Sequence, residues 1–110
     1  MTSNAKAIIV VNVATRDDLA AEHFPIYEEL YQAYRDRGLQ ILAFPCNQFK
    51  EGAPESNEKT KSKIVENYKT SFPIFSKIKV GGMNAHPLFT WLQAQVKTEI
   101  KANFSKYLLD

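Results

Sequence analysis

The segment from Leu39 to Phe44 (L-Q-I-L-A-F) constrains the fold more than any other part of the sequence. It is apolar except for one glutamine, which is typical of a strand covered on both faces at the centre of a parallel sheet. Pro45 cannot donate the next ladder hydrogen bond, so we expect the strand to end there. Cys46–Gln48 follow directly. Because open α/β sheets usually carry their chemistry beyond the carboxyl ends of their strands, any site is expected in this region.

A second apolar segment, Ala7 to Val13 (A-I-I-V-V-N-V), is rich in β-branched residues and predicts the first buried strand. Between the two strands, Phe24 to Arg37 carries apolar residues at helical spacing. Pro25 suits the first turn of this helix, and Gly38 suits the left-handed residue beyond its end. A strand, a helix and a strand in this order predict a right-handed β-α-β unit with two parallel strands.

Two further helices are expected. Ser56 or Asn57 can cap a helix that runs to about Thr70, and Pro87 suits the first turn of another. The apolar positions at helical spacing are Ile64, Val65 and Tyr68 in the first helix and Leu88, Trp91, Leu92 and Val96 in the second. We expect these side chains, together with Phe89 and the tyrosines of the Phe24 to Arg37 helix, to be core or half-buried.

The rest of the chain predicts extended structure. Phe72 to Val80 (F-P-I-F-S-K-I-K-V) contains a proline, which favours a connecting segment over an interior strand. Asn103 to Leu109 (N-F-S-K-Y-L-L) alternates partly and predicts a further strand. With 110 residues and no linker or repeat, we expect a single domain over residues 1–110.

The charge pattern argues against a nucleic-acid partner. The chain has 14 basic and 12 acidic residues and a net charge of +2, whereas nucleic-acid binding needs clustered basic residues. The lysines between Lys59 and Lys69 spread around one helix and are expected to be solvated. One cysteine cannot form an internal disulfide, and the apolar run after Lys6 is short and interrupted by Asn12. We therefore expect an intracellular protein, cytoplasmic or organellar, without membrane insertion.

Six collinear motifs give the sequence a resemblance to the glutathione peroxidase family. The motifs are V-N-V-A-T (Val11 to Thr15), L-A-F-P-C-N-Q-F (Leu42 to Phe49), P-x-S-N-E (Pro54 to Glu58), F-P-I-F (Phe72 to Phe75), N-A-H-P-L (Asn84 to Leu88) and N-F-S-K-Y-L-L-D (Asn103 to Asp110). The resemblance implies a thioredoxin-like α/β fold with a central, mostly parallel sheet flanked by helices. It also implies that the chain lacks the family's N-terminal hairpin and its C-terminal strand and helix.

The resemblance also locates the family's catalytic positions in this chain. The redox-active cysteine or selenocysteine lies in a family segment like N-V-A-S-x-C-G, where this sequence has Asp17. The supporting glutamine of F-G-G-Q-E-P is replaced by Gly52. The tryptophan of W-N-F is replaced by Ala102, and only its asparagine, Asn103, is kept. A carboxylate has no sulfur oxidation chemistry, so these changes predict a site without peroxidase activity and without a cofactor.

Two functions remain open from the sequence. The first is a catalytically inactive homologue retained as a structural or interaction subunit, since an uncovered sheet edge and face would favour other protein subunits or self-association. The second is a weak thiol-dependent peroxidase or redox sensor that uses Cys46. We expect Cys46 to be a structural residue, because no partner base is evident in the sequence.

A metal or ligand site is a third interpretation. Asp17, Asp18, Glu22 and His23 carry ligand types for metals, but their spacing is not diagnostic, and a solvated loop in which an aspartate caps the next helix explains them as well. His86 precedes Pro87 in a motif that the family carries outside its catalytic set, so we expect it to be structural.

Overall fold

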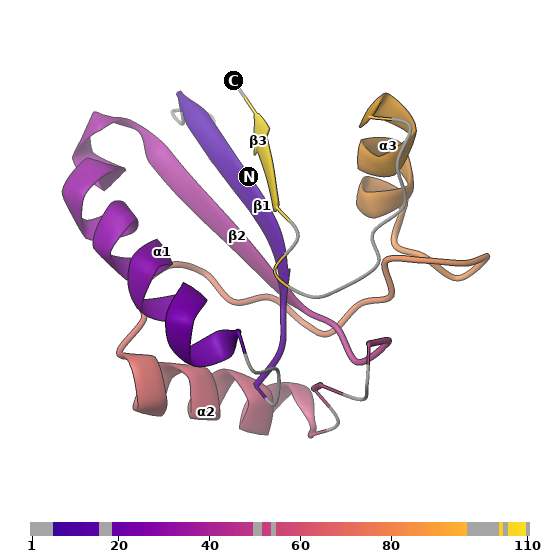
Figure 1. Cartoon of the computed structure of the whole chain (residues 1–110), viewed down its shortest axis with the longest axis horizontal. Coiled ribbons are helices and arrows are strands. Elements are labelled where there is room, and N and C mark those ends of the chain that lie inside the picture. Colours follow the sequence, from indigo (N-terminus) through magenta and orange to yellow (C-terminus); the bar gives the residue numbers. More distant parts are fainter. Residues whose placement is uncertain are drawn as a thin grey trace.

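Three strands form a sheet with the order β2-β1-β3. The computed structural model describes residues 6–15, 19–49, 52–53, 55–96, 104 and 106–109. Strand β1 (Ala7–Val13) pairs in parallel with β2 (Leu39–Pro45), with Val10 opposite Leu42. On its other side β1 pairs antiparallel with β3 (Lys106–Leu109) (Figure 1). The predicted β-α-β unit and the predicted last strand are therefore present.

The prediction that Leu39–Phe44 is the central strand of the sheet is wrong, because β1 occupies that position. Strand β3 takes the edge of β1 that β2 leaves free. The outer edge of β2 meets the segment Phe72–Val80, which makes one isolated parallel bridge between Ala43 and Ile74. This segment is extended without being a regular strand, as its proline predicts. The burial expected of β2 is nevertheless observed, since its side chains from Ile41 onward are buried on both faces.

Helix α1 (Ala20–Tyr34) begins four residues before the predicted start, and a short 3₁₀ turn over Arg35–Arg37 follows it. Pro25 therefore lies inside the helix rather than in its first turn. Proline loses one backbone hydrogen bond there, but the buried side chains of Ala20 and Phe24 anchor the early turns to the core. Gly38 adopts φ 100° beyond the end, as predicted.

Helix α2 (Asn57–Tyr68) begins as predicted and ends two residues early. The hydroxyl of Ser56 accepts a hydrogen bond from the backbone N–H of Lys59 at 3.3 Å, which is an N-cap. Lys69 ends the helix in a left-handed conformation with φ 54°. Of the predicted apolar side chains, Ile64 is buried but Val65 is 39% exposed.

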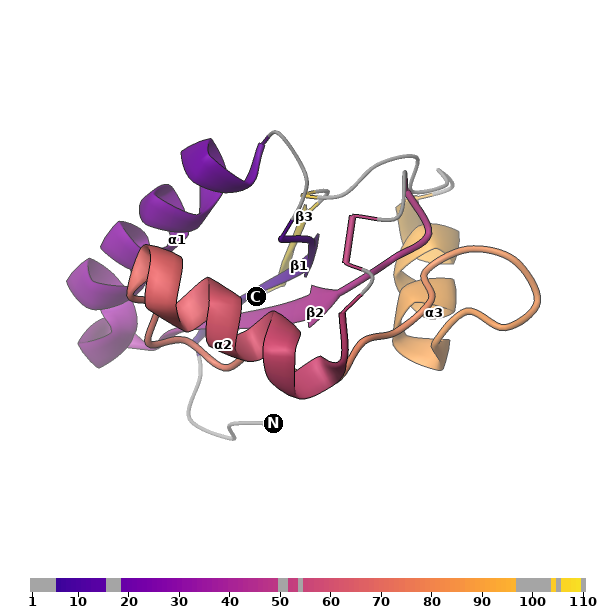
Figure 2. The same cartoon turned by 90° about the horizontal axis from the view of Figure 1, so that it is seen from below.

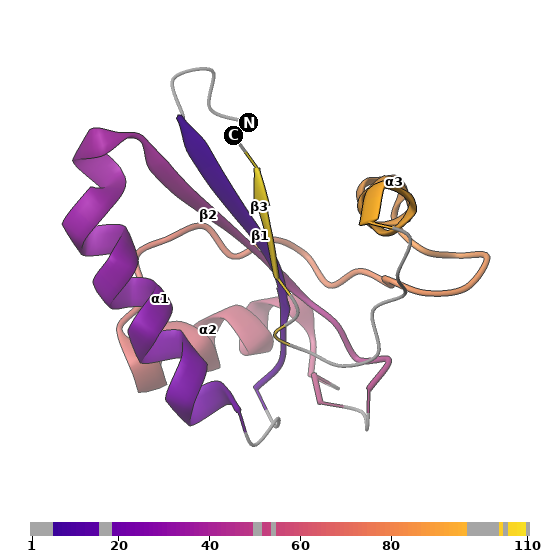
Figure 3. The ribbon, with the colours of Figure 1, turned by 45° about the horizontal axis from the view of Figure 1, so that its top comes forward.

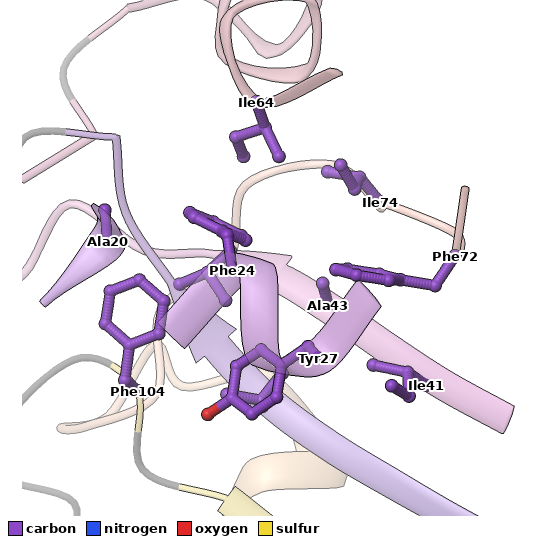
Figure 4. Packing of buried hydrophobic residues seen from close by; sticks show 11 residues of the cluster. Ala20, Phe24, Tyr27, Ile41, Ala43, Ile64, Phe72, Ile74 and Phe104 are labelled. Atoms are coloured by element: carbon purple, nitrogen blue, oxygen red, sulfur yellow. The ribbon is translucent and has the colours of Figure 1, made fainter. Parts of the chain in front are cut away.

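One face of the sheet is covered by α1 and α2 (Figures 1 and 2). Figure 4 shows how their aromatic and aliphatic side chains meet between the helices and the strands. Phe24 stacks on Tyr68 with ring centroids 4.9 Å apart and meets Phe104 edge-on at 5.3 Å. The buried members of this cluster are Val11, Val13, Ala20, Phe24, Tyr27, Ile41, Ala43, Ile64, Phe72, Ile74 and Phe104. Phe104 therefore packs against α1.

The opposite face is covered by helix α3 (Pro87–Val96), which Figure 3 shows across the strands from α1. Phe89 and Leu92 face the sheet, and Phe89 meets Phe44 edge-on at 5.5 Å. Leu92 is buried and Leu88 is half-buried against the same cluster, as predicted, but Trp91 is 53% exposed and Val96 is 52% exposed, so the predicted stripe is wrong at these two positions. The pattern misleads because helical spacing alone also fits Trp91, which lies on the side of α3 that the sheet does not contact.

Burial on α2 predicts a specific difference in stability. Ile64→Ala should lower the free energy of unfolding by about 2–5 kcal/mol, because it leaves a cavity in a packed cluster. Val65→Ala, at the adjacent exposed position, should cost less than about 1 kcal/mol. Urea unfolding followed by circular dichroism measures both. Equal losses for the two variants would contradict the packing described for α2.

Candidate functional site

The parallel strands β1 and β2 end side by side, and the candidate site lies at this edge. Val13 is opposite Pro45 in the register, and the backbone N–H of Cys46 donates to the carbonyl of Val13 at 2.9 Å. The hydroxyl of Thr15, two residues beyond β1, lies 3.4 Å from the carbonyl oxygen of Gly52. Segments that are far apart in the sequence therefore meet beyond the carboxyl ends of these strands, where the sequence predicts a site.

Three of the four predicted catalytic positions, Asp17, Ala102 and Asn103, lie outside the described residues. Their described neighbours are at the same end of β1. Thr15 precedes Asp17 by two residues, and the backbone N–H of Phe104 donates to the carbonyl of Asn12 at 2.6 Å. Whether the four positions form one pocket, as the resemblance implies, stays a prediction.

Gly52 is the predicted position that the structure describes. It is buried, and its N–H donates to the carbonyl of Phe49 at 3.1 Å. The neighbouring N–H of Ala53 donates to the side-chain oxygen of Asn47 at 3.0 Å. Gly52 and Ala53 are therefore held through their backbone N–H groups, and a glycine supplies no side-chain amide at the position where the family has a glutamine.

Cys46 has no exposed surface. Its thiol points to the side-chain oxygen of Gln48 at 3.7 Å, and burial raises the pKa of the thiol. The same oxygen accepts hydrogen bonds from the backbone N–H groups of Val80 (2.6 Å) and Gly81 (3.0 Å). Because thiolates rather than thiols react with peroxides, this environment is typical of a structural cysteine.

An open pocket of about 360 Å³ lies next to this region, but Cys46 does not line it. The pocket is lined by Asn47, Gln48, Lys77, Ile78 and Lys79. The amide oxygens of Asn47 and Gln48 already accept backbone hydrogen bonds from neighbouring loops. We therefore assign these two amides to holding the loops together.

Glu55 is a feature of this edge that the sequence does not predict. Its carboxylate forms an ion pair with Lys63 at 2.8 Å and accepts a hydrogen bond from the hydroxyl of Thr15 at 3.2 Å, and the side chain is only 8% exposed. The hydrogen bond from Lys63 is the main cause that lowers the pKa of Glu55 to about 2. Glu55 thus joins the end of β1 to α2 through a charged group. The motif P-x-S-N-E leaves its position unspecified, so nothing in the pattern marked it.

The metal interpretation gains no support from the described residues. His23 Nδ1 lies 3.3 Å from the hydroxyl of Tyr27, and burial raises the pKa of Tyr27 to about 12. No group of three or more histidine, cysteine, aspartate or glutamate side chains could hold a metal ion within the described ranges, which exclude Asp17 and Asp18.

His86 has the structural role expected of it. Its Nδ1 accepts a hydrogen bond from the backbone N–H of Leu88 at 3.1 Å, and its carbonyl accepts one from Phe89 at 2.9 Å. Both donors belong to the first turn of α3, where backbone N–H groups have no partner within the helix. His86 therefore caps α3.

The ion pair of Glu55 predicts a pH-dependent contribution to stability. The folded-state pKa of about 2 is below the ordinary 4.5, so the contribution is fully present above pH 4.5 and is lost as the pH falls towards 2. Glu55→Gln should therefore lower the free energy of unfolding by about 1 kcal/mol at pH 6, and the difference from the parent chain should shrink at low pH. Urea unfolding across this pH range measures it. Glu66→Gln, at an exposed position on α2, is the control, and a pH-independent loss in Glu55→Gln would contradict the assignment.

The burial of Cys46 predicts slow modification of its thiol. In the folded chain it should react with a thiol reagent such as DTNB at least ~100-fold more slowly than an exposed cysteine. The matched comparison is the double variant Cys46→Ala with Ser62→Cys, which moves the single thiol to an exposed position on α2. Equal reaction rates in the two proteins would show that Cys46 is accessible.

Comparison with known proteins places these features in a family. A family profile described as "Glutathione peroxidase" matches residues 2–93. The chain is 39% identical over 109 residues to "Probable glutathione peroxidase 8" of Arabidopsis thaliana, covering 96% of this chain and 65% of the relative. It is 41% identical to "Probable phospholipid hydroperoxide glutathione peroxidase" of Nicotiana sylvestris, covering 96% of this chain and 64% of the relative. The chain therefore spans somewhat less than two thirds of these relatives.

Solved structures agree on the fold. The crystal structure of T. cruzi GPX1 superimposes with a TM-score of 0.69 at 33% identity, covering 94% of this chain and 64% of the other. A thioredoxin-family thiol:disulfide interchange protein of Chlorobium tepidum gives a TM-score of 0.70 at 14% identity, over 97% of this chain and 63% of the other, which supports the fold alone. No helix within the described ranges has the length and apolar character to cross a membrane. The chain has the thioredoxin-like α/β fold and belongs to the glutathione peroxidase family.

Proposed function

We propose that this chain is a catalytically inactive member of the glutathione peroxidase family that acts as a structural or interaction subunit in a larger, intracellular assembly. The observation that carries the proposal is Asp17, which stands where the family's motif has its redox-active cysteine or selenocysteine. The function of a fold depends on its site, and in this sequence the reacting atom has been replaced.

The chemistry explains why this replacement matters. In peroxide reduction a thiolate attacks one oxygen of the O–O bond, the bond breaks, and the sulfur becomes a sulfenic acid that a second thiol reduces. An aspartate carboxylate has no equivalent oxidation state from which a thiol could regenerate it. The replacements at Gly52 and Ala102 also remove two supporting side chains, and one donor at a developing charge is typically worth about 10² to 10³ in rate.

A weak thiol peroxidase or redox sensor is the alternative, and it would have to use Cys46 because the chain has no other cysteine. Burial and the raised pKa of Cys46 argue against this function. A single thiol also leaves no second cysteine in the chain to resolve a sulfenic acid.

Exposed apolar side chains support the interaction part of the proposal. On α1, Ile26 is 49% exposed and Tyr34 is 46% exposed, and together with Leu30 they border a shallow pocket on the helix surface. Leu108 on β3 is 69% exposed. Surfaces of this kind often mark protein contacts.

Steady-state peroxidase assays test the proposed function. With hydrogen peroxide or a phospholipid hydroperoxide as oxidant and glutathione or thioredoxin as reductant, the chain should show no turnover above a protein-free control. An active glutathione peroxidase under the same conditions is the positive control. Turnover that disappears in Cys46→Ser would overturn the proposal and establish the thiol peroxidase instead.

Restoring the family residues tests the reason for the inactivity. The triple variant Asp17→Cys, Gly52→Gln, Ala102→Trp should consume hydroperoxide, whereas Asp17→Cys alone should be about 10²-fold slower or worse because the supporting side chains are missing. Activity in the single variant equal to that in the triple variant would show that Gly52 and Ala102 are not part of the defect. Circular dichroism of each variant checks that it is folded.

A further inference from the structure

The pocket beyond the carboxyl end of β2 is a feature that the proposed function does not use. It has a volume of about 360 Å³ and is lined by Asn47, Gln48, Lys77, Ile78 and Lys79. The first two of these residues follow β2 closely, and the other three belong to the extended segment that runs beside β2. Open α/β sheets bind their ligands in such a position, outside the carboxyl ends of the strands.

Hydrogen bonds hold the two sides of this pocket together. The backbone N–H of Ile78 donates to the carbonyl of Pro45 at 2.9 Å. The backbone N–H of Val80 donates to the side-chain oxygen of Gln48 at 2.6 Å. The backbone N–H of Lys77 donates to the side-chain oxygen of the first residue of α2 at 2.8 Å. The pocket is therefore formed before a ligand binds, which lowers the entropic cost of binding.

The described lining of the pocket is positively charged. Lys77 and Lys79 are two positions apart in an extended segment, so their side chains leave it on the same side. Neither lysine forms an ion pair within the part of the chain that the structure describes, whereas Lys63 nearby is paired with the carboxylate of Glu55. The ammonium group of Lys77 donates one hydrogen bond to the backbone carbonyl of Glu55, which leaves two of its N–H groups for a ligand.

Asn47 adds a neutral donor to these two charges. Its side-chain oxygen accepts a hydrogen bond from the backbone N–H of Ala53 at 3.0 Å. Its NH₂ group makes no hydrogen bond to any residue that the structure describes. The pocket thus carries two ammonium groups and one amide donor, which is a donor set that suits an anion with several oxygen atoms.

We propose that this pocket binds a phosphate monoester group through the side chains of Lys77, Lys79 and Asn47. A phosphate monoester carries a charge between about −1.5 and −2 at pH 7, which matches the two unpaired lysines. Lysine binds phosphate groups as a point charge. The pocket volume lies within the ~300–1,000 Å³ of small-molecule sites, so it also has room for the organic part of the ligand. The inference goes beyond the proposed function and does not depend on the chain being catalytically inactive.

An NMR titration with phenyl phosphate tests the site. In the ¹⁵N-labelled 110-residue chain, at constant ionic strength, the amide signals of residues 47–48 and 77–79 should shift and saturate with a Kd of about 1 mM. Acetate, a monoanion, should bind at least about tenfold more weakly. Lys77→Gln and Lys79→Gln should each weaken phenyl phosphate binding about tenfold, because each removes a charged hydrogen-bond donor.

Two further variants separate the site from general surface charge. Asn47→Asp keeps an oxygen that can accept from Ala53 but replaces the NH₂ group by a negatively charged oxygen, so it should abolish the saturable shifts. Lys61→Gln, at an exposed position on α2 outside the pocket, is the control and should bind as the parent chain does.

Vesicles that contain phosphatidic acid form a second arm, because the same phosphate group occurs on soluble molecules and on this lipid headgroup. Sedimentation with these vesicles that Lys79→Gln abolishes would identify a lipid as the carrier, and saturable binding of phenyl phosphate alone would identify a soluble one. Absence of both, acetate binding as tight as that of phenyl phosphate, or binding that both lysine variants leave unchanged would overturn the proposal. None of these results would alter the outcome of the peroxidase assays.

Discussion

The burial of strand β1 on both faces, with a partner on both edges, is the constraint on which the rest of the structure depends. Val10 and Val11 have at most 1% of their surface exposed, and they point to opposite faces of the sheet. The helices α1 and α2 pack on one of these faces and α3 on the other. Because β1 also pairs with both β2 and β3, its position is fixed relative to these two strands.

The same packing limits the chemistry of the described residues at the carboxyl ends of β1 and β2. Cys46 follows β2 into the cluster beneath α3, where burial raises the pKa of its thiol. The carboxylate of Glu55 lies beside the end of β1, where Lys63 and Thr15 hold it in place. These interactions stabilise the loops of a peroxidase-like scaffold. None of the residues that make them supplies an accessible nucleophile.

Periodicity predicted the strands and helices well, because β1, β2 and α2 bury continuous or regularly spaced apolar residues. It failed where a local signal was ambiguous. Pro25 suggested a helix start, but the burial of Ala20 extends α1 backwards. Trp91 and Leu92 both fit the helical pattern of α3, but tertiary packing decides which of the two side chains faces the sheet. Glu55 could not be predicted, because its partners Thr15 and Lys63 come from different segments.

We propose that this scaffold has lost the atom that reduces peroxides, and a single-turnover experiment measures that loss without a reductant. Pre-reduced chain is mixed with one equivalent of hydroperoxide without any added thiol, and peroxide loss and intact protein mass are followed together. We expect no peroxide loss beyond that seen with Cys46→Ser and no added oxygen on the protein. Consumption of one equivalent per chain, with oxidation at Cys46, would contradict it.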